Sequence, residues 1–189
     1  MATDSGTIVL MEYFLIGLIF PLGSTLATLA VVCQVLSLLL AIFLVREWGS
    51  GEAMSHTIIH FLARHGVLLM LIVAFTASMG SLFFSEIAAW APCKLCWLQR
   101  IFMYPQVALL GYALWRGDRH ILPYVLFLCL IGMSISIVHY SEQVLAMIDP
   151  VGHDASVPCD ASGISCATAY LLAYGYITVP MLALTAFVS

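Results

Sequence analysis

The stretch APCKLCWLQR, residues 91–100, places two thiols three residues apart at the start of a long apolar run. Pro92 suits the first position of a helix, where its missing N–H costs no hydrogen bond. A helix that begins there directs free backbone N–H groups and the positive end of its dipole towards Cys93 and Cys96. Cys93, Cys96 and Arg100 follow i, i+3, i+7 spacing and therefore share one helix face. Because a helix N-terminus and an Arg both favour the reactive thiolate, we interpret this stretch as a redox dithiol at a membrane surface.

The composition around this stretch is that of a multi-pass membrane protein. Of the 189 residues, 63% are hydrophobic and only 8% are charged, whereas roughly a quarter of the residues in a soluble domain are charged. The net charge is −4 and the sequence contains no basic patch, which argues against nucleic-acid binding. The first six residues contain no Lys or Arg, so we expect no cleaved secretory signal.

Apolar runs predict the membrane-spanning helices, because about twenty apolar residues cross the hydrocarbon core. The predicted spans are residues 26–45, 66–85, 95–115, 121–140 and 167–188. Residues 7–20 are apolar but end at Pro21 and Gly23, so we expect an interfacial or re-entrant segment there, with a second full span as the alternative. We also expect a short surface helix over 144–148. We therefore expect an all-α integral membrane protein, with a four-helix transmembrane bundle over 66–189. The N-terminal extension, 1–65, would add one transmembrane helix and a cytoplasmic linker.

The basic residues predict which side of the membrane each connection faces. Four of the six flank spans on one side, which the positive-inside rule makes cytoplasmic: Arg46, Arg64, Arg116 and Arg119. Four of the six cysteines then lie at the outer face, where disulfide chemistry takes place: Cys93, Cys96, Cys159 and Cys166. Cys33 and Cys129 sit inside apolar runs, and we expect them to be packing residues.

A Cys-x-x-Cys pair alone also fits half a zinc site or a structural disulfide. Cys159 and Cys166 could complete a four-thiolate zinc site, but the spacer 160–165 is wider than a usual ligand knuckle. We therefore expect no metal. A single loop at a membrane surface scarcely needs two structural disulfides, so the redox interpretation is favoured.

Three polar residues beside the thiols could support redox chemistry. An Arg inside a span costs about 2.5–3.5 kcal/mol at mid-bilayer and less near the interface, so Arg100 is expected to stabilise negative charge. Gln99 could hydrogen-bond a carbonyl beside it. His139 ends the span 121–140 at the same outer level and could assist.

These residues also carry a family resemblance. The run PCKLCWLQRIFMYP, residues 92–105, resembles the DsbB/BdbC family of membrane thiol oxidases. HYSEQ at 139–143 and GYITVPM at 175–181 resemble the BdbC branch in particular. The resemblance covers about 66–189, and residues 1–65 have no counterpart in the basic four-helix pattern. It implies a bacterial cytoplasmic-membrane enzyme that reoxidises a DsbA-like thioredoxin-fold partner and passes the electrons to ubiquinone or menaquinone.

The resemblance also implies a role for each cysteine. Cys159 and Cys166 match the mobile-loop pair, with Cys159 forming the mixed disulfide with the partner. Cys166 would pass the electrons to Cys93, leaving Cys96 as the thiolate against the quinone ring. Arg100 matches the quinone-site arginine of the family, and we group Gln99 and His139 with it as cofactor-binding residues.

Two other functions fit parts of the pattern. A vitamin K epoxide reductase-like protein also combines four helices, two cysteine pairs and a quinone. Its C-x-x-C lies on the last bundle helix, after the loop pair, whereas Cys93 and Cys96 come first here. A non-catalytic zinc-binding or assembly module would use the four outer cysteines as ligands.

Overall fold

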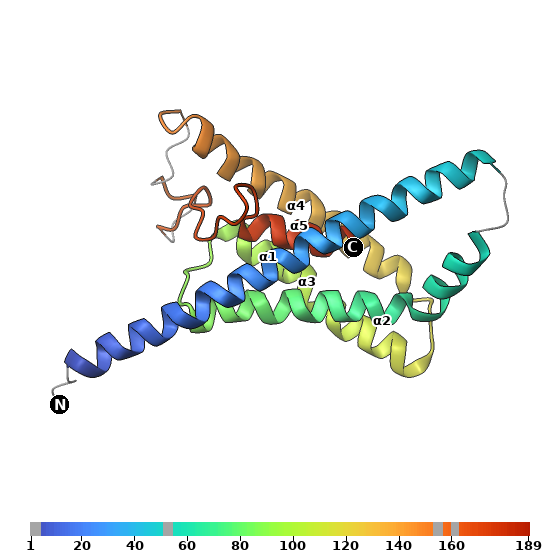
Figure 1. The fold of residues 1–189 in the computed structure, drawn as a ribbon, viewed down its shortest axis with the longest axis horizontal. Helices are drawn as coiled ribbons and strands as arrows, with labels where there is room; N and C mark the ends of the chain where they lie inside the picture. Colours follow the sequence, from blue (N-terminus) through green and yellow to red (C-terminus); the bar gives the residue numbers. More distant parts are fainter. Residues whose placement is uncertain (1–4, 51–54, 153–156, 160–162) are drawn as a thin grey trace.

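The computed structural model describes the backbone of residues 5–50, 55–152, 157–159 and 163–189, and the side chains of 17–46, 60–152, 157–159 and 163–189. The regular secondary structure in these ranges is helical, apart from one isolated β-bridge between Ala173 and Ile177. The helices are α1 (Ser5–Ser50), α2 (Ser55–Leu82), the π-helical turn η1 (Phe83–Ile87), α3 (Lys94–Arg116), α4 (Leu122–Ile148) and α5 (Val179–Val188) (Figure 1). The prediction of an all-α protein is confirmed.

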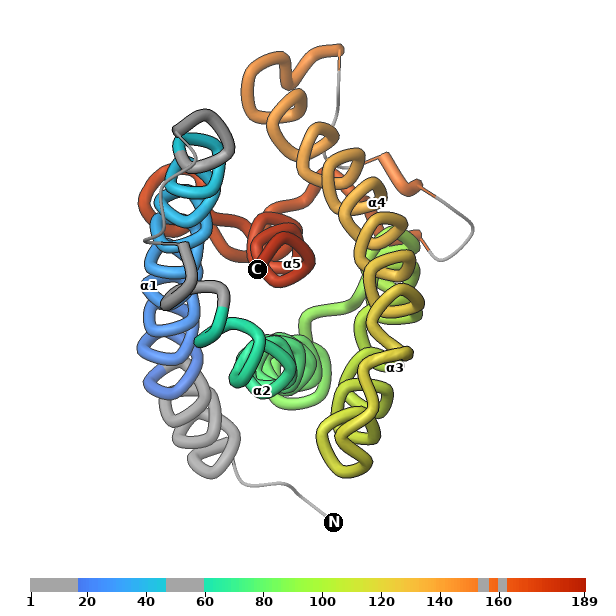
Figure 2. The backbone as a smooth tube through the Cα atoms, turned by 90° about the vertical axis from the view of Figure 1, so that its right-hand side faces the viewer, coloured from blue at the N-terminus to red at the C-terminus, as the bar shows by residue number. Residues whose placement is uncertain are grey.

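The helices pack in chain order, α2 on α3, α3 on α4 and α4 on α5. α1 lies along α5 and, over fewer residues, along α2, so that α5 is enclosed by its neighbours (Figure 2). One apolar core joins α2, α3 and α4 through Ala74, Leu110 and Val125. A second joins α3 to α5 through Met103 and Phe187.

Three segments of the described chain are long and apolar enough to cross a membrane: Gly17–Arg46, His60–Ile87 and Leu122–Ile148. Large apolar side chains on these segments face outward, as expected for a protein whose surroundings are lipid. α3 falls outside this set because the polar residues Gln99, Arg100 and Gln106 interrupt its apolar sequence, and α5 because it has only 10 residues. The protein is a multi-pass membrane protein, while the four-plus-one bundle stays a prediction.

Two predictions for the N-terminal region were wrong. No break separates residues 7–20 from the span 26–45, because α1 runs unbroken with Pro21 inside it. An apolar helix tolerates one missing backbone hydrogen bond when the rest of the backbone keeps its internal bonds. The predicted linker 46–65 also contributes its second half to α2, which begins at Ser55.

Two predictions for the C-terminal half were also wrong. The span 167–188 is helical only from Val179, because Tyr174 and Gly175 have positive φ values of 53° and 77° and turn the chain. α4 does not stop at residue 140 but continues to Ile148, so 144–148 forms its last turn rather than a surface helix. Nothing in the sequence interrupts α4 before Pro150.

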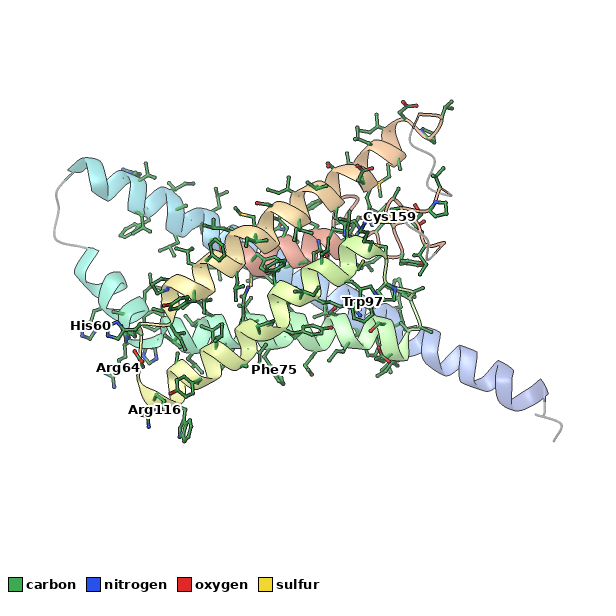
Figure 3. All side chains as sticks on the ribbon, turned by 180° about the vertical axis from the view of Figure 1, so that it is seen from behind. His60, Arg64, Phe75, Trp97, Arg116 and Cys159 are labelled. Carbon is green, nitrogen blue, oxygen red and sulfur yellow. A yellow bond between two sulfur atoms is a disulfide. The ribbon has the colours of Figure 1, made fainter. Side chains whose placement is uncertain are left out.

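Several basic residues gather at one end of the bundle, away from the start of α3 (Figure 3). Figure 3 shows His60, Arg64 and Arg116 together at that end, with Trp97 and Cys159 in the opposite half. Arg119 also lies at the basic end, where its guanidinium donates to the carbonyl of Ala63. The cysteine region is therefore remote from the basic end.

Candidate thiol redox site

The first cysteine pair is built into the start of α3. Cys93 is the N-cap residue, with φ −74° and ψ 173°, and its Sγ accepts a hydrogen bond from the backbone N–H of Cys96 at 3.4 Å. We predicted Pro92 at the first helical position, but it lies immediately before the cap, because the sulfur of Cys93 itself caps the helix. The Sγ atoms of Cys93 and Cys96 lie 3.2 Å apart, as a reduced dithiol.

His139 on α4 connects this dithiol to the second cysteine pair. Its ring is 1% exposed, and its Nε2 lies 3.5 Å from Cys93 Sγ and 3.1 Å from the carbonyl oxygen of Cys166. Because a carbonyl only accepts hydrogen bonds, Nε2 carries the proton and donates. The buried Nδ1 has no hydrogen-bond partner among the described residues.

These neighbours make Cys93 the thiolate of the pair. A hydrogen bond from the Cys96 thiol lowers the pKa of Cys93 most, and the hydrogen bond and charge of His139 and the Cys96 backbone N–H add to it. Burial opposes them, and the net result is a pKa of about 4, against an ordinary value of 9.0. The reactive form is therefore held at the helix terminus, as the sequence suggested in general terms.

The second pair, Cys159 and Cys166, is joined by a disulfide with an S–S distance of 2.07 Å. Cys159 is exposed, whereas Cys166 is 4% exposed and lies against His139. Cys159 is therefore open to a partner, whereas the buried Cys166 contacts His139 through its backbone carbonyl oxygen. Because the loop cysteines are bonded to each other, this structure does not form the alternative four-thiolate zinc site.

Arg100 and Gln99 are buried between helices. Arg100 donates from Nε to Ser81 Oγ at 3.0 Å and from Nη2 to the Ser81 carbonyl at 3.1 Å. Its guanidinium carbon also lies 5.1 Å from the centre of the Trp97 ring, within the range of a cation–π contact. Gln99 donates from Nε2 to Ser136 Oγ at 3.1 Å. Both side chains thus point into the bundle rather than reaching out to the membrane surface.

A cavity of about 280 Å³ opens beside the dithiol, between α1, α2, α3 and α5. Both thiols line it, together with the neighbouring polar side chains of Gln99, Arg100, Ser81 and His139. Most of its remaining lining is apolar. One wall is an aromatic stack in which Trp90 lies between Phe84, at a centroid distance of 4.7 Å, and Tyr170, at 5.6 Å.

Sequence reasoning missed Ser81, Ser136 and Gln143, which hold or line the site. Gln143 donates from Nε2 to the carbonyl of Thr168 at 3.1 Å. Ser136, His139 and Gln143 are buried and follow i, i+3, i+7 spacing on α4. The signal that could have identified Ser136 and Gln143 is the recurrence of polar residues at helical spacing inside an apolar span.

Comparisons with known proteins agree with this geometry. The family model described as "Disulfide bond formation protein DsbB" matches residues 63–168. The chain is 47% identical to disulfide bond formation protein C of Bacillus subtilis, over 62% of this chain and 80% of that protein. It is 43% identical to a probable disulfide formation protein C of Halalkalibacterium halodurans, over 62% and 81%. It is also 36% identical to a probable disulfide formation protein of Metapseudomonas resinovorans, over 65% and 81%. No solved structure shows a significant match.

The match extends from α2 across α3 and α4 to residue 168, and so includes both cysteine pairs. It sets aside the vitamin K epoxide reductase-like alternative and confirms the resemblance seen in the sequence. The protein is a membrane-embedded, disulfide-forming oxidoreductase, and this chain belongs to the DsbB family.

Proposed function

We propose that this protein reoxidises the dithiol of a DsbA-like thioredoxin-fold partner and passes the electrons through its two cysteine pairs to a membrane quinone. The observation that carries the proposal is the position of His139, whose Nε2 contacts both Cys93 Sγ and the Cys166 carbonyl. The loop pair and the helix pair thus meet at one buried site, which opens on an apolar cavity.

The exchange steps follow from which sulfurs are accessible. A partner thiolate attacks the exposed Cys159, the Cys159–Cys166 bond breaks, and Cys166 leaves as a thiolate. Cys166 then attacks Cys93 of an oxidised Cys93–Cys96 pair, and the Cys96 thiolate is released beside the cavity. The second partner thiol displaces Cys159, which leaves the partner oxidised.

Cys159 then attacks Cys166 and releases Cys93, so that two electrons have passed to the helix pair. The loop pair is then oxidised and the helix pair reduced, which is the state described above. Cys96 carries the negative charge while Cys93 is bonded to Cys166, and Cys93 carries it in the free dithiol.

The cavity fits a quinone in shape and polarity. Ligand pockets are mostly apolar with a few polar groups that fix orientation, and this cavity combines a mostly apolar lining with Gln99, Arg100 and His139 beside the thiols. Two buried polar atoms of its lining residues, His139 Nδ1 and Gln143 Oε1, have no partner among the described residues. A bound quinone would accept two electrons and two protons. Arg100 would stabilise the negative charge that develops beside Cys96, and Gln99 and His139 would hydrogen-bond the head group.

The proposed location is the bacterial cytoplasmic membrane, with both cysteine pairs facing out of the cell. The basic residues support this orientation, because Arg64 and Arg116 lie at the end opposite Cys159 (Figure 3).

The test is a coupled assay with the purified protein, a reduced DsbA-like partner and either ubiquinone or menaquinone. We expect quinone absorbance to fall as the partner is oxidised, and a Cys96→Ser variant to abolish the reaction. Cys129→Ser is the matched control, because this thiol lies outside the cavity, in the apolar core near Gln106. Undiminished turnover by the Cys96→Ser protein would remove the proposed site.

A further inference from the structure

Helix α1 precedes the residues that the family model matches, yet it forms part of the cavity. Four of its residues line the cavity at i, i+3, i+4, i+7 spacing: Leu26, Leu29, Ala30 and Cys33. They therefore present one continuous helix face. Val32, Leu36 and Leu39 on the same helix are about half exposed and do not line the cavity.

Hydrogen bonds fix α1 to the C-terminal segment in one register. Gln34 donates from Nε2 to Thr185 Oγ1 at 2.7 Å and accepts at Oε1 from the Tyr176 hydroxyl at 3.0 Å. Six residues earlier, Thr28 Oγ1 and the Tyr174 hydroxyl are 2.8 Å apart. Polar contacts between helices in apolar surroundings have few alternative partners, so these bonds specify where α1 sits.

Close packing brings α1 against both neighbouring helices. Ala27 and Ala30 are buried, which lets the backbone of α1 approach α5. On the other side, a Cβ on Gly80 of α2 would lie 3.1 Å from a methyl carbon of Leu26, so Leu26 rests directly on this glycine. α1 thus bridges α5 and α2 beside the cavity (Figure 2).

Two parts of the cavity lining differ in chemistry. The thiols and Arg100 line one part of the cavity, whereas α1 contributes apolar groups and one thiol: Leu26, Leu29, Ala30 and Cys33. A prenylated quinone has the same asymmetry, with a polar ring and an apolar tail. Its ring would therefore face the sulfurs, while its tail would lie along α1.

We propose that α1 is the tail-binding wall of the quinone site, with Leu29, Ala30 and Cys33 contacting the first prenyl units. This inference rests on the proposed function, since it assigns the apolar part of the same cavity. α1 then determines how strongly the enzyme prefers prenylated over tail-less quinones.

Cys33 provides a direct probe of this wall, because it is a free, half-buried thiol that lines the cavity. The experiment uses the full-length Cys93→Ser protein, in which quinone cannot oxidise the Cys93–Cys96 pair. Alkylation of Cys33 and Cys96 by N-ethylmaleimide is followed by peptide mass spectrometry. Two fully substituted rings are compared, ubiquinone-2 with a prenyl tail and duroquinone without one.

We expect both quinones to slow the alkylation of Cys96 and only ubiquinone-2 to slow that of Cys33. Protection of Cys96 but not Cys33 by ubiquinone-2 would overturn the assignment of α1 and leave the proposed function intact. Equal protection of Cys33 by duroquinone would also overturn it. Protection of neither thiol would contradict both proposals.

A pair of variants tests the wall itself. Ala30→Leu adds bulk on the cavity face, and we expect the half-protecting concentration of ubiquinone-2 at Cys96 to rise about tenfold. Ala41→Leu makes the same substitution at an exposed position of α1 that does not line the cavity, and it should leave that concentration unchanged. Equal half-protecting concentrations of ubiquinone-2 for the two variants would overturn the proposal.

Discussion

Replacement of His139 by Leu should raise the pKa of Cys93 and lower the reduction potential of the Cys93–Cys96 pair. His139 Nε2 lies 3.5 Å from Cys93 Sγ, and its hydrogen bond and charge are among the causes that bring the pKa of Cys93 to about 4. Leu fills a similar volume and provides no donor. The change therefore removes the stabilisation of the thiolate while it keeps most of the packing.

The expected size follows from the value of one hydrogen bond to a charged group, about 1.5–3 kcal/mol. This energy corresponds to about 1–2 pKa units, so the pKa of Cys93 should rise to roughly 5–6. The Cys93 thiolate exists above this pKa and is protonated as the pH falls through it. At pH 7 the stabilised thiolate therefore favours the reduced dithiol over the disulfide. Loss of His139 should therefore lower the reduction potential at pH 7 by about 30–60 mV.

The pKa is measured from the rate of iodoacetamide alkylation of reduced Cys93 between pH 3 and pH 9, with the modified residue located by mass spectrometry. The potential is measured by equilibration in thiol–disulfide buffers. His120→Leu, at the connection between α3 and α4, is the control and should change neither value. If the His139→Leu midpoint coincides with that of the unmodified protein, the role assigned to this side chain is refuted.

Other substitutions test the rest of the site and its packing. Arg100→Ala should raise the KM for quinone at least about tenfold with little change in thiol exchange with the partner, and equal loss of both would contradict its role. Gly132→Val would place a Cβ 2.3 Å from ring carbons of Phe187, so we expect thermal unfolding to show a loss of about 1–3 kcal/mol of stability. Gly111→Ala is the control and should cost much less stability, because the space around its Cβ is open. Ser136→Ala removes the partner of a buried amide and should cost about 1–3 kcal/mol, and an unchanged melting temperature would show that this bond contributes nothing.

Features of the sequence that act locally predicted much of the structure. The spacing of Cys93, Cys96 and Arg100 depends only on helix geometry, and all three residues line the same cavity. The long apolar runs likewise predicted helical spans around residues 26–45 and 66–85; the first lies within α1 and the second within α2 and the adjoining η1. These patterns are reliable because each depends on a single helix and on the lipid or water around it, and not on contacts with other helices.

Features that depend on contacts between helices could not be predicted in this way. Ser81 and Arg100 are far apart in the sequence, and no pattern indicates that one holds the other. Residues 167–178 contain no charged residue and continue the apolar run of α5, so hydropathy alone does not reveal the turn at Gly175. The docking of α1 depends on Gln34, whose partners belong to the C-terminal segment. Tertiary packing, rather than local propensity, decided these points.

The relay from the loop pair to the helix pair is tested most directly by trapping its central disulfide. In a Cys96→Ser, Cys159→Ser protein, Cys93 and Cys166 keep their positions on either side of His139 but lose their usual partners. After mild oxidation, peptide mapping without reductant should show a Cys93–Cys166 disulfide within one chain. Separate alkylation of both thiols under the same conditions would contradict the proposed path of the electrons.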